Sequence, residues 1–135
     1  MENCIFCKIV KKEIHSKIVY EDKYSLAFLD VNPVNLGHTL VITKKHLETI
    51  NEISDKELNE LIKIVKKISD AILKNSEGLN VMQNNKKSAG QLVPHLHFHL
   101  IPRYFGDGHK FDWKTKKVSE EENKQFIEKI KRLLK

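Results

Sequence analysis

The stretch His95-Leu96-His97-Phe98-His99 decides how this chain folds, because its histidines alternate strictly with apolar residues. Successive side chains of a β-strand point to opposite faces of the sheet, so the alternation predicts a strand with all three imidazoles on one face. Leu96, Phe98 and Leu100 then enter the core from the other face. Imidazole acts as an acid, base, nucleophile or metal ligand near neutral pH, so the histidine face is a dense reactive surface.

Two chemistries fit three histidines on one strand. The first is catalysis with a histidine nucleophile. The second is metal binding, since His-x-His on a strand is a common way to hold zinc. A polar face that is histidine-rich by accident is the weaker explanation, because the chain has only seven histidines in 135 residues.

Composition favours a soluble protein that forms one domain over residues 1–135. Hydrophobic residues make up 40% of the chain, but the apolar runs are only a few residues long, so no membrane-spanning helix and no membrane partner are expected. The stretch Met1–Cys4 lacks the charged-then-apolar order of a signal peptide, which makes the cytoplasm the expected location.

The net charge of +6 is spread over short lysine pairs along the chain and is not gathered in one basic block. This charge favours anionic ligands in general, nucleotides included. Aromatic residues are not interleaved with the basic ones as a single-strand-binding protein requires, so no nucleic-acid partner is expected.

Periodicity predicts an α+β domain with about five strands and two substantial helices. The expected strands span residues 17–20, 24–31, 37–43, 79–83 and 95–101, and the last of them stops at Pro102. A short helix is expected over residues 4–12, a long one over 54–75 and a C-terminal one after Ser119. A capping box, serine followed three residues later by glutamate, begins each of the two longer helices. Short links between the first three strands favour an antiparallel meander.

These features resemble the histidine triad (HIT) family, whose naming pattern is His-h-His-h-His-h-h with h apolar. Residues His95–Ile101 carry that pattern. Other segments similar to the family are Cys4–Ile9, Phe28–Pro33, Gly37–His46, Asn84 with Gln91, and Ile101–Arg103. The resemblance covers nearly all of residues 4–105, is best for the prokaryotic branch that begins with Cys-x-x-Cys, and is less diagnostic over the tail and helix of residues 106–135.

The resemblance implies a HIT-like α+β fold with a roughly five-stranded antiparallel sheet, one long central helix and a C-terminal helix. It also implies a homodimer, formed through the helix at 54–75 and the strand at 79–83. The main apolar stripe of that helix comprises Leu58, Leu61, Ile62, Val65, Ile68 and Ile72. Ile64 and Leu73 lie off this stripe, which fits burial on two sides of the helix.

The activity implied by the resemblance is hydrolysis or transfer at the α-phosphorus of adenosine 5′-phosphoramidates or dinucleoside polyphosphates. His97 is by position the nucleophile, and a neutral imidazole can form a nucleotidyl-histidine that water then cleaves. His99 on the same strand face and His38 on a facing strand can donate to the phosphate oxygens. Gln91 and Asn84 fit as neutral donors near the phosphate. Which group protonates the leaving group is left open.

The nucleoside would occupy a neighbouring site. Asp30 is placed to accept hydrogen bonds from the ribose hydroxyls, although alone it would be interpreted as a turn former before Asn32-Pro33. An apolar slot for the base would comprise Ile5, Phe6, Ile9, Phe28 and Val31. Such a slot stacks any purine. Leu92 stands where relatives often carry a hydroxyl residue, so the leaving-group preference stays open. Magnesium is not expected to be required, because no carboxylate pair accompanies these donors.

A second site is predicted from Cys4, Cys7, His46 and His95. Two thiolates and two imidazoles satisfy tetrahedral zinc with no open position, which is typical of a structural site. The two histidines would be neighbours if the strands that hold them pair, and similar Cys-x-x-Cys family members bind zinc there. The alternative is two free thiols near a mobile terminus.

Two other functional hypotheses remain open. A zinc-dependent hydrolase could use the three triad histidines as ligands of a catalytic metal, but it would need a nearby carboxylate base and would leave the cysteines unexplained. A nucleotide-binding regulatory module with little turnover has no need of a nucleophile in line with phosphorus. The remaining histidines, His15 and His109, are expected in surface loops.

Overall fold

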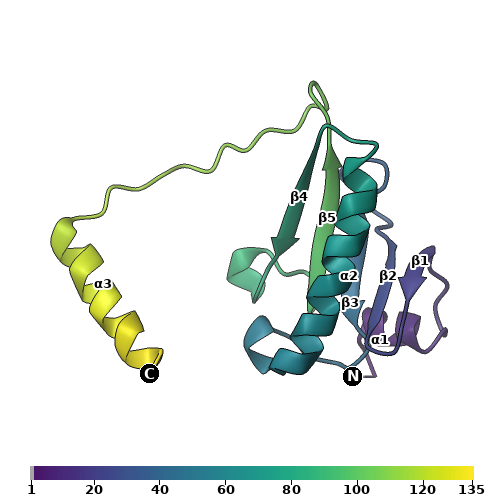
Figure 1. The fold of residues 1–135 in the computed structure, drawn as a ribbon, viewed down its shortest axis with the longest axis horizontal. Helices are drawn as coiled ribbons and strands as arrows, with labels where there is room; N and C mark the ends of the chain where they lie inside the picture. The colour runs from purple at the N-terminus through teal and green to yellow at the C-terminus, as the bar shows by residue number, and fades with distance from the viewer. Residues whose placement is uncertain (1) are drawn as a thin grey trace.

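Five antiparallel strands form one sheet in the computed structural model, which describes residues 2–135. Their spatial order is β1 (Ile18–Glu21), β2 (Ser25–Leu29), β3 (Thr39–Thr43), β5 (His97–Arg103) and β4 (Gly78–Gln83). The first three strands form the predicted meander, whereas β5 inserts between β3 and β4 (Figure 1). The α+β class and the five-stranded antiparallel sheet are therefore confirmed.

Helix α2 (Asp55–Leu73) covers one face of the sheet (Figure 1). It begins at the predicted cap, where the Ser54 hydroxyl accepts a hydrogen bond from the Glu57 N–H. Its buried stripe differs in one respect from the prediction, since Ile62 is 42% exposed and Ile64 is buried. At 100° per residue, Ile64 lies beside Leu61 on the face that meets the sheet, and Ile62 lies on the flank.

Two apolar cores lie on the two faces of the sheet. The core under α2 includes Leu96, Phe98 and Leu100, as the alternation in the last strand predicts. The core on the other face is built around the short helix α1 (Ile5–Val10) and includes Phe6, Cys7, Ile9 and Phe28. The triad histidines therefore lie on the face covered by α1.

The last strand has different ends from those predicted. It begins at His97, because His95 lies in a bend and the Leu96 N–H donates to the Leu47 carbonyl. It also runs through Pro102 to Arg103, where the predicted stop at Pro102 is wrong. The Arg103 carbonyl accepts a hydrogen bond from the Glu77 N–H on the β4 side. The neighbouring residue Pro102 therefore faces the other side, where β3 has already ended and no N–H donor is needed.

The C-terminal helix α3 (Glu120–Leu133) begins with a complete capping box at Ser119. It lies apart from the sheet at the end of an extended segment, and every residue from Gly108 onward is exposed (Figure 1). Its apolar stripe, which includes Phe126 and Leu133, is therefore not covered by residues 2–135. None of the helices within these residues has the length and apolar character needed to cross a bilayer.

Candidate active site and metal site

A cleft of about 480 Å3 lies beside α1 on the face that carries the histidines, and we call it the histidine cleft. All five residues expected to form the base slot line it, namely Ile5, Phe6, Ile9, Phe28 and Val31. Its polar lining includes Asp30, His38, Asn84, His97 and His99. Val31 is 88% exposed and Ile5 is 46% exposed, so these two form the rim, whereas Phe6 and Phe28 form the floor.

His97 is held as a neutral imidazole with a defined tautomer. Its Nδ1 lies 2.6 Å from the backbone oxygen of His95, and because a carbonyl only accepts, Nδ1 carries the proton. The lone pair is therefore on Nε2. Burial lowers the pKa of His97, so the ring is neutral near pH 7. The Phe6 ring packs against it edge to face, with 5.2 Å between ring centroids.

His38 and His99 form a second hydrogen-bonded unit in the cleft. The Val34 N–H donates to His38 Nδ1 at 3.0 Å, so His38 carries its proton on Nε2. That Nε2–H lies 3.0 Å from His99 Nδ1 and donates to it. His99 must then carry its own proton on Nε2, and this N–H is available to donate to a ligand. Burial and the neighbouring histidines lower the pKa of His99 to about 4, and burial also lowers that of His38.

Asp30 forms the turn after β2 and also lines the histidine cleft. One carboxylate oxygen accepts from the Asn32 N–H at 2.8 Å and so forms the turn after β2. The other oxygen lies 3.6 Å from His38 Nε2 and faces the cleft. The turn explains why β2 ends at Leu29 and not at the predicted Val31.

The four predicted metal ligands come together under α1. The ligand atoms of Cys4, Cys7, His46 and His95 all lie within 4.8 Å of one another. His95 is fully buried, and its Nε2 lies 2.7 Å from the Thr43 carbonyl, so that Nε2 donates and the Nδ1 lone pair faces the cysteines. A carbonyl that orients an imidazole in this way is a common outer partner of a metal-binding histidine.

The electrostatics of this cluster also suit a cation. Burial, followed by the neighbouring Cys4, raises the pKa of the Cys7 thiol, and burial lowers the pKa of His95 to about 4. Burial thus favours the neutral forms of the Cys7 thiol and the His95 imidazole in this cluster. A divalent cation would favour the thiolate forms of the cysteines instead, because a coordinating metal deprotonates its thiol ligands. The residues present therefore fit tetrahedral zinc.

Known proteins resemble this chain over most of its length. The sequence model of the HIT domain matches residues 11–106. The chain belongs to the HIT family. It is 43% identical over 131 residues to the adenosine 5′-monophosphoramidase of Schizosaccharomyces pombe, a match that covers 95% of this chain and 96% of that protein.

Solved HIT structures also superimpose closely on this fold. A HIT family protein from Bacillus subtilis matches with a TM-score of 0.89 at 43% identity, over 96% of both chains. A zinc-bound histidine triad family protein from Mycobacterium smegmatis matches with a TM-score of 0.76 at 30% identity, over 98% of this chain and 96% of that one.

The loop between β4 and β5 of this HIT protein places Asn84 and Gln91, both predicted to donate to the phosphate, in different surroundings. Asn84 lines the histidine cleft, but Gln91 does not. The Gln91 side chain is buried, with its oxygen accepting from the Lys86 N–H at 2.7 Å and its nitrogen donating to the Glu48 carbonyl at 2.8 Å. Both ends of this amide therefore hold the loop itself. Gly90 also lines the cleft, but the sequence did not mark it as a site residue because glycine has no functional side chain.

The triad histidines do not converge on one point. His95 turns its free nitrogen toward the cysteines, whereas His99 is hydrogen-bonded to His38. Within residues 2–135, the other close group of possible ligands is Asp30, His38 and His99. A metal bound by all three triad imidazoles would thus require these rings to rearrange.

Proposed function

We propose that this chain is a nucleotide hydrolase or transferase that cleaves adenosine 5′-phosphoramidate-type substrates at the α-phosphorus through a covalent nucleotidyl-His97 intermediate. One observation carries the proposal. The His95 carbonyl holds the proton of His97 on Nδ1, which leaves a neutral Nε2 lone pair in a cleft that also contains imidazole donors. The similarity to a named monophosphoramidase supports the same substrate class.

In the first step His97 Nε2 attacks the α-phosphorus and a new P–N bond forms. The bond between phosphorus and the amine breaks, and the amine leaves with a proton from an imidazole N–H of the cleft. In the second step water attacks the phosphorus and gives a proton back to the imidazole that protonated the amine. The P–N bond to His97 breaks, which releases the nucleotide and restores His97. The Nε2–H of His99 is oriented by His38 and can stabilise the charge on the phosphate oxygens in both steps.

Substrate binding follows from the rest of the cleft. The purine would stack in the apolar slot between Phe6, Ile9 and Phe28, and the ribose hydroxyls would donate to Asp30. Asn84 would donate to the phosphate. Gln91 would support this site indirectly, by holding the loop that presents Asn84 and Gly90. Dinucleoside polyphosphates are a second substrate class for the same cleft.

We also propose a structural zinc ion bound by Cys4, Cys7, His46 and His95. The ion would tie α1 to the loop that follows β3, and so hold Ile5 and Phe6 at the cleft. The convergence of the four ligand atoms supports this, as does the zinc-bound neighbour. Metal analysis of protein purified without chelator should find one zinc per chain, and a content well below one would contradict the proposal.

The assembly we propose is a homodimer of single-domain chains in the cytoplasm, formed through α2 and β4. Strand β4 is at the edge of the sheet, where its unpaired backbone groups are available to a second chain. Ile62, Leu73 and Val81 on these two elements are each more than two-fifths exposed. Sedimentation equilibrium should give twice the chain mass of 15.8 kDa.

The activity is tested with a fluorogenic adenosine phosphoramidate, using the unmodified protein and His97→Ala, each with and without chelator. Turnover that survives chelator and disappears in His97→Ala is the expected result. Turnover that persists in His97→Ala would exclude the nucleophile. Loss of turnover with chelator while the circular dichroism spectrum is unchanged would favour the zinc-dependent hydrolase. Nucleotide affinity without hydrolysis of phosphoramidates or dinucleoside polyphosphates would favour the regulatory module.

A further inference from the structure

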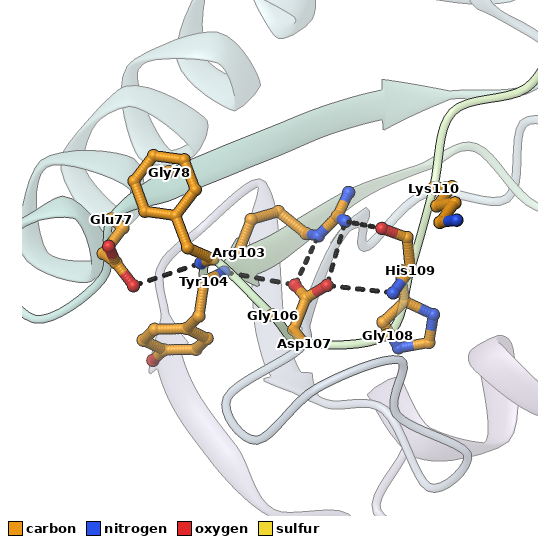
Figure 2. A pocket seen from close by; sticks show the side chains of 10 residues that line it. Glu77, Gly78, Arg103, Tyr104, Gly106, Asp107, Gly108, His109 and Lys110 are labelled. Atoms are coloured by element: carbon orange, nitrogen blue, oxygen red, sulfur yellow. Dashed lines mark hydrogen bonds and ion pairs between the residues drawn. The ribbon is translucent and has the colours of Figure 1, made fainter.

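The turn that follows β5 is organised by a single, partly buried ion pair between Arg103 and Asp107. This turn lines a hollow of about 490 Å3. Figure 2 shows the Arg103 side chain directed at Asp107. Arg103 Nε donates to Asp107 at 2.8 Å, and the other guanidinium nitrogens donate to Asp107, to Asn80 and to the His109 carbonyl. Four of the five guanidinium N–H groups are thus engaged, so Arg103 is committed to holding this turn.

The Asp107 carboxylate accepts from more than Arg103. The backbone N–H groups of Tyr104 and His109 also donate to it, at 3.1 and 3.0 Å. Arg103 above all, together with these N–H groups, holds the pKa of Asp107 well below its usual range, so the carboxylate is charged at every pH at which the protein would work. Gly106 and Gly108 have φ values of +77° and +83°, which the tight turn requires.

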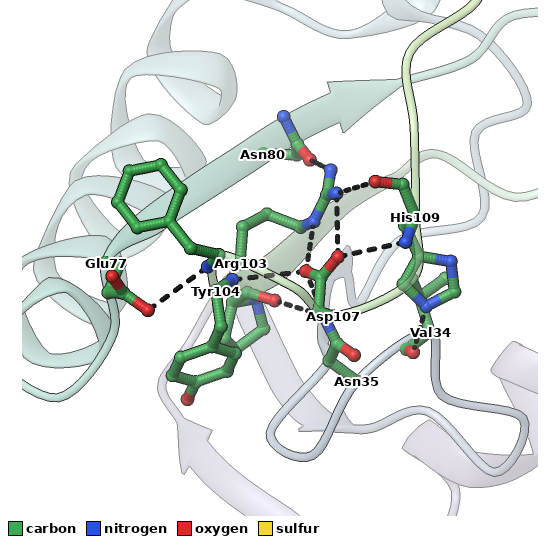
Figure 3. Close-up of polar contacts among 10 residues, drawn as sticks. Val34, Asn35, Glu77, Asn80, Arg103, Tyr104, Asp107 and His109 are labelled. Carbon is green, nitrogen blue, oxygen red and sulfur yellow. Dashed lines mark hydrogen bonds and ion pairs between the residues drawn. The ribbon is translucent and has the colours of Figure 1, made fainter.

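The same turn reaches across to the loop that precedes β3 (Figure 3). The Asn35 side chain donates one proton to Asp107 at 3.0 Å and the other to the Pro102 carbonyl at 2.8 Å. His109 Nε2 donates to the Val34 carbonyl at 2.9 Å. Residues 34 and 35 are therefore held from the side of the turn by two independent hydrogen-bonded connections.

Val34 links this turn to the histidine cleft. Its carbonyl accepts from His109, while its N–H donates to His38 Nδ1. That N–H keeps the His38 proton on Nε2, where it donates to His99. If the loop moved, His38 would lose the donor that selects its tautomer, and His99 would no longer be constrained to present its own N–H to the substrate.

We infer that Asp107 and His109 are positioning residues for the reaction, which hold Val34 against His38 and thereby orient the His38–His99 donor pair. This inference rests on the proposed function. Both residues lie beyond the part of the chain matched by the HIT domain, which ends at residue 106. The segment of the chain that leads to α3 would thus influence the cleft without touching a substrate.

The test compares Asp107→Asn and His109→Ala with the unmodified protein, and Asp70→Asn as a control. Asp70 is an exposed partner of Lys66 on α2, so its variant makes the same chemical change away from the loop. We expect kcat for the phosphoramidate to fall about tenfold in both test variants while KM changes less than about twofold, since loss of an outer partner of a functional imidazole has effects of this order. His109→Gln keeps an N–H donor near the position of Nε2 and should recover part of kcat.

Nitrogen chemical shifts of His38 provide a readout that does not depend on turnover. The unmodified protein and Asp70→Asn should show one His38 tautomer with the proton on Nε2, and the test variants should show a mixture of tautomers. An unchanged His38 tautomer in folded His109→Ala would overturn the inference, as would an unchanged kcat in a variant whose tautomer has shifted. His109 is exposed, so its variant decides the matter if Asp107→Asn does not fold. If the unmodified protein lacks turnover, the chemical shifts still test the orientation of His38, and only the proposed function fails.

Discussion

Replacing Phe6 with alanine tests the packing that joins α1 to the rest of the fold. The Phe6 side chain is only 6% exposed, and its ring meets those of Phe28, His95 and His97 edge to face at centroid distances of 5.5, 5.8 and 5.2 Å. Phe6 therefore packs α1 against the sheet, the histidine cleft and the cysteine–histidine cluster at the same time. A helix of six residues has little stability of its own and depends on such packing.

The expected loss is large for a single residue. Truncating a buried phenylalanine to alanine typically lowers the free energy of unfolding by about 3–5 kcal/mol. Because α1 lies at the surface and can partly collapse into the space left by the ring, we expect about 3 kcal/mol for Phe6→Ala. Ile5 neighbours Phe6 on the same helix but is 46% exposed, so Ile5→Ala should cost about 1 kcal/mol or less.

Urea unfolding of the two variants and the unmodified protein, all with the same metal content, measures these losses. Both variants should also raise KM for the phosphoramidate, since both side chains line the cleft. The reasoning is refuted if Phe6→Ala loses no more stability than Ile5→Ala. In that case α1 would be held by the cysteine–histidine cluster alone.

Three further outcomes are expected. Gln91→Leu, which leaves the hydrogen-bonding partners of a buried amide unsatisfied, should lower the free energy of unfolding by about 2 kcal/mol in urea denaturation and make residues 84–91 susceptible to protease. The pKa of His99 in the folded state, about 4, lies below the ordinary value of 6.5, so unfolding takes up a proton between these values. With chelator present, the contribution of His99 to the free energy of unfolding should therefore be full above pH 6.5 and should decline as the pH falls toward 4. The decline should be shallower in His99→Asn. Urea unfolding across this pH range measures both. Chelator should reduce the melting temperature of the unmodified protein but not that of Cys7→Ser, which already lacks a metal ligand; an equal reduction in both would contradict the structural zinc.

Much of the fold follows from local patterns in the sequence. The alternation of histidine with apolar residues correctly assigned the faces of the last strand, because side-chain direction in a strand depends only on its period of two. The serine caps correctly located the starts of α2 and α3, because a cap is a contact between residues three positions apart. The cysteine and histidine residues of the predicted zinc set were also identified from spacing and residue type, and the fold brings them together.

Other features were decided only when distant segments met. Local rules predict that the last strand ends at Pro102. It continues to Arg103 because β3, the strand that would otherwise accept the N–H missing from proline, has already ended there. Gln91 has the residue type of a phosphate donor, but its amide is used by the Glu48 carbonyl, which is 43 residues away in the chain. Neither partner is visible from a window of neighbouring residues.

The protonation pattern of the cleft is the clearest case. The sequence by itself determined that His38, His97 and His99 are present and that the last two share a face. It did not determine which nitrogen of each ring carries the proton, because that choice depends on the acceptor or donor that the fold places opposite it: a carbonyl for His97, and the Val34 N–H for His38. Periodicity is a local property of the chain, whereas hydrogen-bond direction is set by atoms brought together from distant strands and loops.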